Sequence, residues 1–358
     1  MTLSGRSTAT HTLDTGPVRT SSPGPGEVEL APAYIGICDT DLPNPHCTTP
    51  ARLKRPTVLG HEMAGLIVQV GPGTEGWQPG DAVSVMPLRW DGGCPACRAD
   101  HRHTCRSGHQ HNCRHLDFIS SDSPGTMQLR WTVPAATLVR LPPAVTLDRG
   151  ALIEPTAVAV RDVGRAGVRS GERVVVVGGG PIGLLIALVA RAAGADTRII
   201  EPSTHRRQIA AGLELSTWDP TTDDVRELVA QWSGPAGPDV AFEVSGAVDG
   251  LAAAIDTVAV RGRLCLVATH PRPRLANLRR FFGRELTLVD ARLHHLPDYA
   301  KAVALIEDGT VPADKLISRV VPLTEVTSAF QPPECSDDLM KILVACGSDV
   351  AGAPAWNS

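Results

Sequence analysis

Residues 173–201 constrain the fold most, because one unbroken run predicts a strand, a glycine turn, a helix and a second strand. The β-branched run 173–177 is typical of a strand that is buried on both faces. It leads directly into a turn with the spacing GxGxxG, and an apolar helix at 182–193 and a strand at 197–200 come next. This order predicts a βαβ unit of a parallel sheet.

The glycine turn itself has the composition of a phosphate-binding loop. Gly178 permits a tight turn, Gly180 allows the backbone to approach a pyrophosphate closely, and Gly183 allows the helix to pack on the strand. The predicted helix starts at Ile182, directly after Pro181, and the free N–H groups and dipole of its N-terminus favour an anion. Because a strand precedes this turn and a helix follows it, we predict dinucleotide binding rather than a bare structural turn.

The second predicted strand ends in an acid that bears on the choice of dinucleotide. Glu201 lies 18 residues past Gly183, a distance at which a carboxylate can accept both ribose hydroxyls of an adenosine. The same charge would repel a 2′-phosphate, so we expect NAD rather than NADP. Arg206 and Arg207 follow closely and keep NADP open as the alternative, although such arginines are also typical of a solvated helix start.

Composition excludes several classes of protein. The 358 residues exceed one typical domain and suggest two. Thirty-four basic and 38 acidic residues give a net charge of −4, and no basic stripe suits a nucleic acid. The longest apolar run, 182–190, is shorter than the ~20 residues that span a bilayer, and residues 1–15 lack the apolar core of a signal peptide. We therefore expect a cytoplasmic protein with no nucleic-acid or membrane partner.

Four residues at distant points of the chain combine the ligand types of an open, catalytic zinc site. Cys38 follows an apolar run, His61 and Glu62 are adjacent, and Glu154 precedes a proline. Each alone has an ordinary structural explanation, as a buried thiol, a core histidine, a surface carboxylate or a helix cap. Together, a thiolate, an imidazole and a carboxylate hold zinc and leave one position for water or substrate.

A second group of cysteines lies on one short segment. Its members are Cys94, Cys97, Cys105 and Cys113, with spacings of two, seven and seven residues. Four thiolates in a short lobe are typical of a closed, structural zinc site, and nine cysteines in a reducing compartment favour ligation or burial over disulfides. Five histidines between residues 101 and 115 keep a Cys3His site open as a variant.

These motifs, in this order, resemble those of the zinc-dependent medium-chain dehydrogenase/reductase family, and in particular its sorbitol, butanediol and glucose dehydrogenase branch. The resemblance runs from about residue 23 to about residue 345. It rests on the segments 36–41, 60–62, 80–81, 154–155 and 178–183, on the four lobe cysteines, and on 201–203 with Arg206.

The resemblance implies an α/β protein with two parts. A GroES-like, β-rich catalytic domain would comprise residues 1–155, with the structural-zinc lobe at 94–113. A Rossmann NAD-binding domain with a doubly wound parallel sheet would comprise residues 156–292. Residues 293–358 would return to the catalytic domain and end in a disordered tail.

The resemblance also implies reversible hydride transfer between a secondary alcohol, on a polyol, sugar or cyclitol, and NAD. Zinc held by Cys38, His61 and one carboxylate would lower the pKa of the substrate hydroxyl, and Thr40 would pass the proton outward. Ser245 and Val267 would follow two later Rossmann strands and flank the nicotinamide. The family tends to form dimers and tetramers, so we expect a homodimer or homotetramer.

Two carboxylates, Glu62 and Glu154, compete for one place at this zinc. A second bound carboxylate would leave a net charge of −1 and weaken the pull on the substrate oxygen. We therefore predict that only one coordinates when substrate is bound, and that the other lies beside the site or exchanges with water. The chain departs from the family at Pro43, where polyol dehydrogenases often place a histidine, and at residues 120–131, which lack a glycine-rich pocket segment. Two alternatives therefore stay open: a zinc-independent quinone or enoyl-type reductase, and a non-catalytic NAD-binding scaffold.

Outside these motifs the sequence predicts little regular structure at the N-terminus. Residues 1–22 are expected to be loosely ordered, and a Pro-Gly turn at 23–26 leads into two separate strands at 27–31 and 33–37. A later helix is expected at 299–307 and a closing strand at 341–344.

Overall fold

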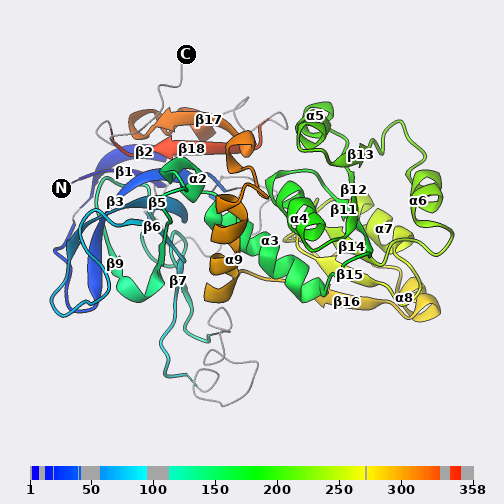
Figure 1. Ribbon diagram of the computed structural model, residues 1–358, viewed down its shortest axis with the longest axis horizontal. Coiled ribbons are helices and arrows are strands. Elements are labelled where there is room, and N and C mark those ends of the chain that lie inside the picture. The colour runs from blue at the N-terminus through cyan, green and yellow to red at the C-terminus, as the bar shows by residue number, and fades with distance from the viewer. Residues whose placement is uncertain are drawn as a thin grey trace.

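The structure, a computed structural model, describes residues 2–7, 13–18, 20–38, 40–41, 57–94, 113–270, 272–330 and 339–347. These residues form two parts that are each built on a sheet. Helices α3 (Ile153–Ala166) and α9 (Leu296–Glu307) lie between the two parts (Figure 1). The predicted α/β class is confirmed.

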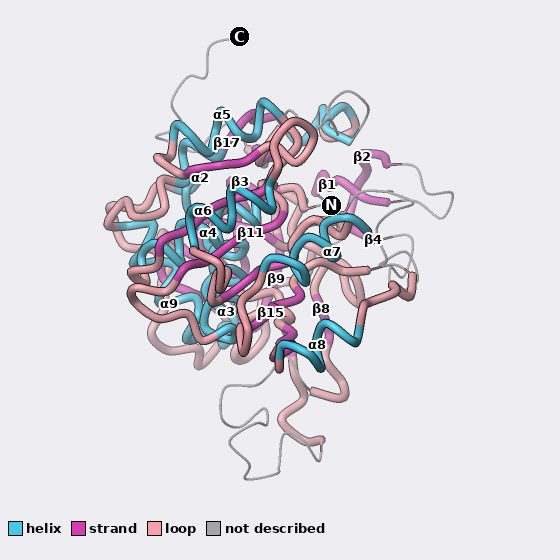
Figure 2. Tube along the Cα trace, turned by 90° about the vertical axis from the view of Figure 1, so that its right-hand side faces the viewer, coloured by secondary structure: helices cyan, strands magenta, loops and turns pink. Residues whose placement is uncertain are grey.

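One part is a six-stranded parallel sheet with the order β13-β12-β11-β14-β15-β16. Counted from β11, this is the order 3-2-1-4-5-6 of a Rossmann sheet, and in Figure 2 its strands lie between α4 on one side and α7 and α8 on the other. The predicted doubly wound sheet is therefore confirmed. Its strands are β11 (Arg173–Val177), β12 (Asp196–Ile200), β13 (Ser216–Trp218), β14 (Val240–Glu243), β15 (Arg263–Leu266) and β16 (Thr287–Asp290). Its helices are α4 (Pro181–Ala192), α5 (Thr204–Gly212), α6 (Val225–Ser233), α7 (Val248–Thr257) and α8 (Leu278–Arg284).

The other part is a mainly antiparallel sheet with the order β10-β6-β5-β3-β18-β17, in which β9 also pairs with β3. Strands β17 and β18 come from the end of the described chain, and β18 pairs with β3 in the register Leu343 to Gly36. The chain therefore returns to this sheet, as the resemblance implied. The strands are β3 (Glu27–Gly36), β5 (Glu62–Val70), β6 (Ala82–Val85), β9 (Trp131–Pro134), β10 (Leu138–Arg140), β17 (Ile317–Pro322) and β18 (Lys341–Ala345).

The expectation that residues 1–22 are loosely ordered is wrong. Strands β1 (Thr2–Ser7) and β2 (Leu13–Val18) pair antiparallel, and the end of β1 pairs with β4 (Thr57–Val58). Strands are stabilised by pairing with distant partners, which a Ser- and Thr-rich segment does not reveal locally. A further small pair consists of β7 (Leu88–Arg89) and β8 (Asp117–Phe118).

The two separate strands expected at 27–31 and 33–37 form one continuous strand, β3. Pro32 suggested a break, because proline cannot donate a hydrogen bond to a neighbouring strand. In the structure, the pairing of β3 with β5 shifts in register between Pro32 and Tyr34. An irregularity of this kind accommodates the proline without ending the strand.

A shared apolar core joins the two parts through α3. The core cluster extends from Tyr34 and Ala64 of the antiparallel sheet, past Val160 of α3, to Val176 and Leu184 of the Rossmann part. Helix α3 packs against both α4 and α9, and the short helix α2 (Leu147–Gly150) precedes it. The domain limit proposed at residue 155 lies inside α3, and the domain limits stay predictions. In the part of the chain that the structure describes, no helix combines the length and apolar character needed to cross a membrane.

Candidate active site

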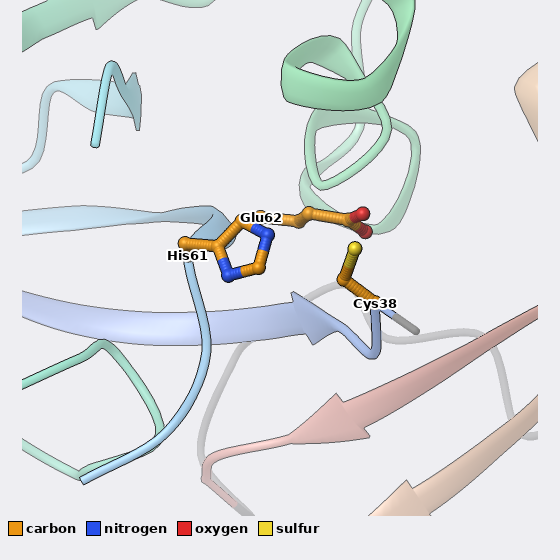
Figure 3. A group of neighbouring side chains, drawn as sticks. All are labelled: Cys38, His61 and Glu62. Atoms are coloured by element: carbon orange, nitrogen blue, oxygen red, sulfur yellow. The ribbon is translucent and has the colours of Figure 1, made fainter. Parts of the chain in front are cut away.

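The pairing of β3 with β5 brings three of the predicted metal ligands together. Gly36 lies opposite Glu62 in this antiparallel pair, so the residues just after β3 meet those at the start of β5. The ligand atoms of Cys38, His61 and Glu62 all lie within 4.8 Å of one another. In Figure 3 the Cys38 thiol and the Glu62 carboxylate point toward each other beside the His61 ring. Thr40 is half-buried in the turn that follows Cys38.

Two glycines make room for this cluster. A Cβ built on Gly36 would lie 2.0 Å from Glu62 Oε2, so any side chain there would displace the carboxylate. Gly60 has φ +89°, and a Cβ built on it would lie 2.8 Å from both Ile35 and Met127. Such a backbone conformation is easily adopted only by glycine. The glycine of the Gly-His-Glu motif is thus explained by the positive φ that the backbone adopts at Gly60, just before His61.

A lysine that sequence analysis missed compensates the charge of Glu62. Lys341, the first residue of β18, donates to Glu62 Oε1 and Oε2 at 2.8 and 2.7 Å and to the carbonyl of Ile37 at 3.1 Å. Both side chains are buried. Burial raises the pKa of Glu62, and the charge of Lys341 only partly opposes this effect. The available signal was a lysine at the start of an otherwise apolar strand, where a cation needs a partner.

Glu154 lies in the first turn of α3 and has a different partner. Its Oε1 atom is 2.7 Å from Nε2 of His294, another residue that sequence analysis missed. His294 is fully buried, and its ring packs edge-on against Tyr299. Burial raises the pKa of Glu154, but the charge and hydrogen bond of His294, together with the charges of His61 and Lys341, outweigh burial, and the pKa is lowered. Among the described residues, the group of three ligand atoms includes Glu62 and not Glu154.

A buried aspartate, Asp41, supports His61 and was also missed as a site residue. Its Oδ1 atom lies 3.6 Å from Nδ1 of His61. The carboxylate accepts hydrogen bonds from the N–H groups of Cys38 and Gly60, at 3.2 and 3.4 Å, and from the hydroxyl of Ser120 at 3.0 Å. Burial would raise the pKa of Asp41, but the charge of His61 and the hydrogen bonds to the carboxylate together outweigh burial, and the pKa is lowered.

The cluster fits a zinc ion by the chemistry of its donors. A thiolate, an imidazole and a carboxylate are the ligand types of open zinc sites. Because Asp41 faces Nδ1 of His61, Nε2 is the nitrogen left for a metal, an arrangement common among metal-binding histidines. A thiolate and one carboxylate would together contribute a charge of −2, and the imidazole is neutral. These ligands would therefore balance the +2 charge of Zn²⁺.

The glycine turn has the geometry that its spacing predicts. Gly178 has φ +108°, and a Cβ built on it would lie 2.9 Å from the backbone nitrogen of Ser245. A Cβ built on Gly183 would lie 1.9 Å from the carbonyl oxygen of Gly178, so only glycine lets the helix approach the strand. Helix α4 begins at Pro181, with Gly180 before it. Ser245 and Val267 follow β14 and β15 at the carboxyl edge of the sheet.

Glu201 lies at the same edge, directly after β12. It is 3% exposed, and its two oxygens accept hydrogen bonds from the N–H groups of Gly179, at 2.6 Å, and Ser203, at 2.7 Å. A Cβ built on Gly180 would lie 3.7 Å from Nη1 of Arg206, so this guanidinium borders the turn. Arg207 instead donates to backbone carbonyls and pairs with an aspartate.

Only half of the predicted structural-zinc set can be described, because Cys97 and Cys105 lie outside the described residues. Cys94 and Cys113 are buried, with their sulfur atoms 3.9 Å apart. The carboxylate of Asp91 belongs to the same group of possible ligands, and His115 forms a hydrogen bond with it. The described thiols therefore converge, and sequence analysis missed the carboxylate.

Comparison with known proteins agrees with this arrangement of two parts. The family model described as "Alcohol dehydrogenase GroES-like domain" matches residues 24–143. The model described as "Zinc-binding dehydrogenase" matches residues 181–308. The first covers the cluster of Cys38, His61 and Glu62, and the second covers the end of the glycine turn, from Pro181, and Glu201.

Individual proteins match over nearly the whole chain. The 2-dehydro-3-deoxy-L-galactonate 5-dehydrogenase of Pseudoalteromonas atlantica is 40% identical, over 92% of this chain and 94% of its own length. The (R,R)-butanediol dehydrogenase of Bacillus subtilis is 30% identical, over 84% of this chain and 87% of its own. A zinc-binding dehydrogenase of Sinorhizobium meliloti, solved with NADP, superposes with a TM-score of 0.87 at 25% identity, covering 96% of this chain and 99% of that one. The chain thus belongs to the zinc-dependent medium-chain dehydrogenase/reductase family, whose members are oxidoreductases that act on alcohols with a nicotinamide cofactor.

Proposed function

We propose that this protein reversibly oxidises a secondary hydroxyl group of a polyol or sugar, and more narrowly of a sugar acid, with NAD as the hydride acceptor. The observation that carries this proposal is the convergence of Cys38, His61 and Glu62 from separate strands on one buried point. The narrower substrate class is supported by the relative with 40% identity, whose name describes a deoxy sugar acid as its substrate.

The roles of the residues follow from their contacts. Cys38, His61 and Glu62 would hold the catalytic zinc, and Glu154, held by His294, would stay beside it as the second carboxylate. A bound zinc would supply the Lewis acidity that lowers the pKa of a substrate hydroxyl. Thr40, in the turn after Cys38, would accept the proton of that hydroxyl and pass it toward solvent.

We propose NAD as the cofactor because of Glu201. Its buried carboxylate lies against the glycine turn, where it would accept the ribose hydroxyls of NAD and repel the 2′-phosphate of NADP. Arg206 borders the turn and is the residue that would favour NADP. Gly178, Gly180, Pro181, Ile182 and Gly183 would hold the pyrophosphate, and Ser245 and Val267 would flank the nicotinamide.

A second zinc is proposed for the lobe. Cys94 and Cys113 would hold it together with Cys97 and Cys105, and such a closed site would stabilise the fold without contacting the substrate. A homodimeric or homotetrameric assembly is a further prediction from the family resemblance, and light scattering of the purified protein tests it. A cytoplasmic location is a further prediction from the composition of the chain.

The decisive experiment combines metal analysis with a substrate screen. We expect one catalytic and one structural zinc per chain, NADH formation with sugar acids or polyols, and loss of one zinc together with turnover in Cys38→Ala. Full turnover in Cys38→Ala would instead support a zinc-independent reductase. NAD binding without turnover of any sugar acid, polyol or aminocyclitol would support a non-catalytic scaffold.

A further inference from the structure

The turn that follows β8 places a serine against the carboxylate that supports His61. Ser120 Oγ donates to Asp41 Oδ1 at 3.0 Å, and the same oxygen lies 3.6 Å from His61 Nδ1. Ser120 is 2% exposed and Asp41 4%, so water does not compete for this bond. We propose that Ser120 is a positioning residue of the metal centre, which holds the Asp41 carboxylate toward His61; this inference rests on the metal site proposed above.

The backbone of Ser120 indicates that its hydroxyl is required. Its φ is +82°, in the left-handed region that glycine adopts freely and other residues adopt at a cost. Its N–H donates to the carbonyl of Ser123 at 2.9 Å, so the turn itself is well satisfied. A glycine would make the same turn without strain but would leave Asp41 without this donor. Strain retained at a residue beside an active site is a reason to look for a function.

The chain after Ser120 is held firmly against the residues that precede His61. The N–H groups of residues 125–127 donate to the carbonyls of residues 58–60 at 2.8–2.9 Å. Phe118, the last residue of β8 before this turn, places its ring centre 5.1 Å from that of His61. The end of β8 therefore contacts the His61 ring directly, and the turn after it reaches the Nδ1 side through Asp41.

This geometry predicts how the Ser120 hydroxyl affects metal binding. A carboxylate that orients a metal-binding histidine fixes the ring and raises its basicity, and its loss weakens metal binding about 10- to 100-fold. Cys38 and Gly60 supply backbone N–H groups to Asp41, at 3.2 and 3.4 Å, and Ser120 supplies the shorter bond at 3.0 Å. Loss of the Ser120 hydroxyl should let Asp41 turn away and weaken metal binding by a smaller factor.

The test measures zinc release to a chromogenic chelator from the intact protein. Zinc from the catalytic site is identified as the kinetic phase of release that is absent from Cys38→Ala. We expect Ser120→Gly and Ser120→Ala both to release this zinc several-fold faster, and Asp41→Asn about tenfold faster or more. Ser123→Ala is the matched control, because its hydroxyl is buried in the same turn without a hydrogen-bond partner among the described residues; it should release zinc at the wild-type rate.

A double variant separates positioning from a purely structural role. In the Asp41→Asn background, Ser120→Gly should cause no further acceleration, because the serine acts through the aspartate. Unchanged zinc release in Ser120→Gly, or additive effects in the double variant, would overturn the inference while leaving the proposed function intact. A wild-type protein with no Cys38-dependent zinc phase would overturn the proposed metal site and this inference with it.

Discussion

Two regions of this protein are built to hold charged groups by different means. They are the glycine turn at residues 178–183 and the cluster of Cys38, His61 and Glu62. The turn is one contiguous segment, and it works through backbone N–H groups and the absence of side chains at Gly178 and Gly183. The cluster is assembled from strand ends far apart in sequence, and its buried charges have partners of their own. Changes in the turn should therefore alter cofactor binding and helix packing but leave the metal ligands in place, whereas changes in the cluster can leave a buried charge unpaired and affect both stability and chemistry.

The largest effect is expected from Cys38→Ala. If the cluster holds the catalytic zinc, turnover should fall by about a thousandfold or more, because Lewis-acid stabilisation is worth several kcal/mol. Steady-state kinetics with metal analysis measures this. Cys346→Ala is the matched control, since Cys346 is a buried free thiol that follows β18 of the same sheet; it should lower stability and keep its zinc and its activity per folded molecule. Equal losses in both variants would contradict a chemical role specific to Cys38.

A second large effect is expected from Lys341→Ala, now on stability. In the metal-free protein, removal of one partner of this buried ion pair should cost about 3–5 kcal/mol, because Glu62 would remain buried without a cation. The folded variant would then hold a proton on Glu62 to higher pH than the unfolded chain does. Its stability deficit should therefore shrink as the pH is lowered. Urea unfolding at several pH values measures both points.

The double variant Lys341→Met with Glu62→Gln sharpens this prediction. It removes both charges, so it should recover much of the stability lost in Lys341→Ala, although it also removes a proposed zinc ligand. A double variant that is less stable than Lys341→Ala would show that the pair contributes more than mutual charge compensation.

The two regions also differ in how far sequence reasoning reaches. Strand β11, the turn and α4 were predicted within a residue or two, because one contiguous segment carries the apolar periodicity and the glycine spacing that determine them. Cys38, His61 and Glu62 were recognisable as motif residues for the same reason. Lys341, His294 and Asp41 were missed, since each acquires its role from a partner that only the folded chain brings near. No local sequence pattern predicts that β18 will lie beside β3.

The same limit explains why the sequence does not identify the substrate. The sequence identifies the ligand types and the cofactor turn, but it does not identify the alcohol, because residues that line a substrate pocket are brought together only by long-range packing. The N-terminal strands illustrate this limit, because β1 pairs with β2 along its length and with β4 at its end, and its own composition predicts neither pairing.

An intermediate effect is expected in the turn region from Glu201→Ser. Loss of a charged acceptor for the ribose hydroxyls should lower kcat/KM with NAD about 10- to 100-fold, since hydrogen bonds to charged groups are worth ~1.5–3 kcal/mol. Activity with NADP should hold or rise, because the repulsion is removed. Zinc content should not change, in contrast to Cys38→Ala. Glu307→Ser changes an exposed acid at the end of α9 and should leave the preference for NAD as it is; unchanged preference in Glu201→Ser would contradict the assignment.

The smallest effect concerns Asp162, a carboxylate on α3, the helix that also carries Glu154. It is 1% exposed, and its Oδ2 atom has no hydrogen-bond partner among the described residues. Burial raises its pKa well above the ordinary value of 3.8, although the charge of Arg161 opposes the shift. Between the unfolded and folded pKa values, the folded chain holds a proton that the unfolded chain has lost. Stability should therefore fall as the pH rises through this window and be fully retained below it.

Asp162→Asn tests whether a buried carboxylate that forms no ion pair within the described part of the chain behaves differently from Glu62 and Glu154, which have partners. The amide cannot ionise, so the variant should lose this part of the pH dependence and gain about 1 kcal/mol at neutral pH. Urea unfolding as a function of pH measures it, and Asp249→Asn, an exposed aspartate on α7, should retain the wild-type slope. If Asp162→Asn retained that slope too, the pH dependence would have to come from the paired carboxylates of the cluster, and the contrast between paired and unpaired charges drawn above would fail.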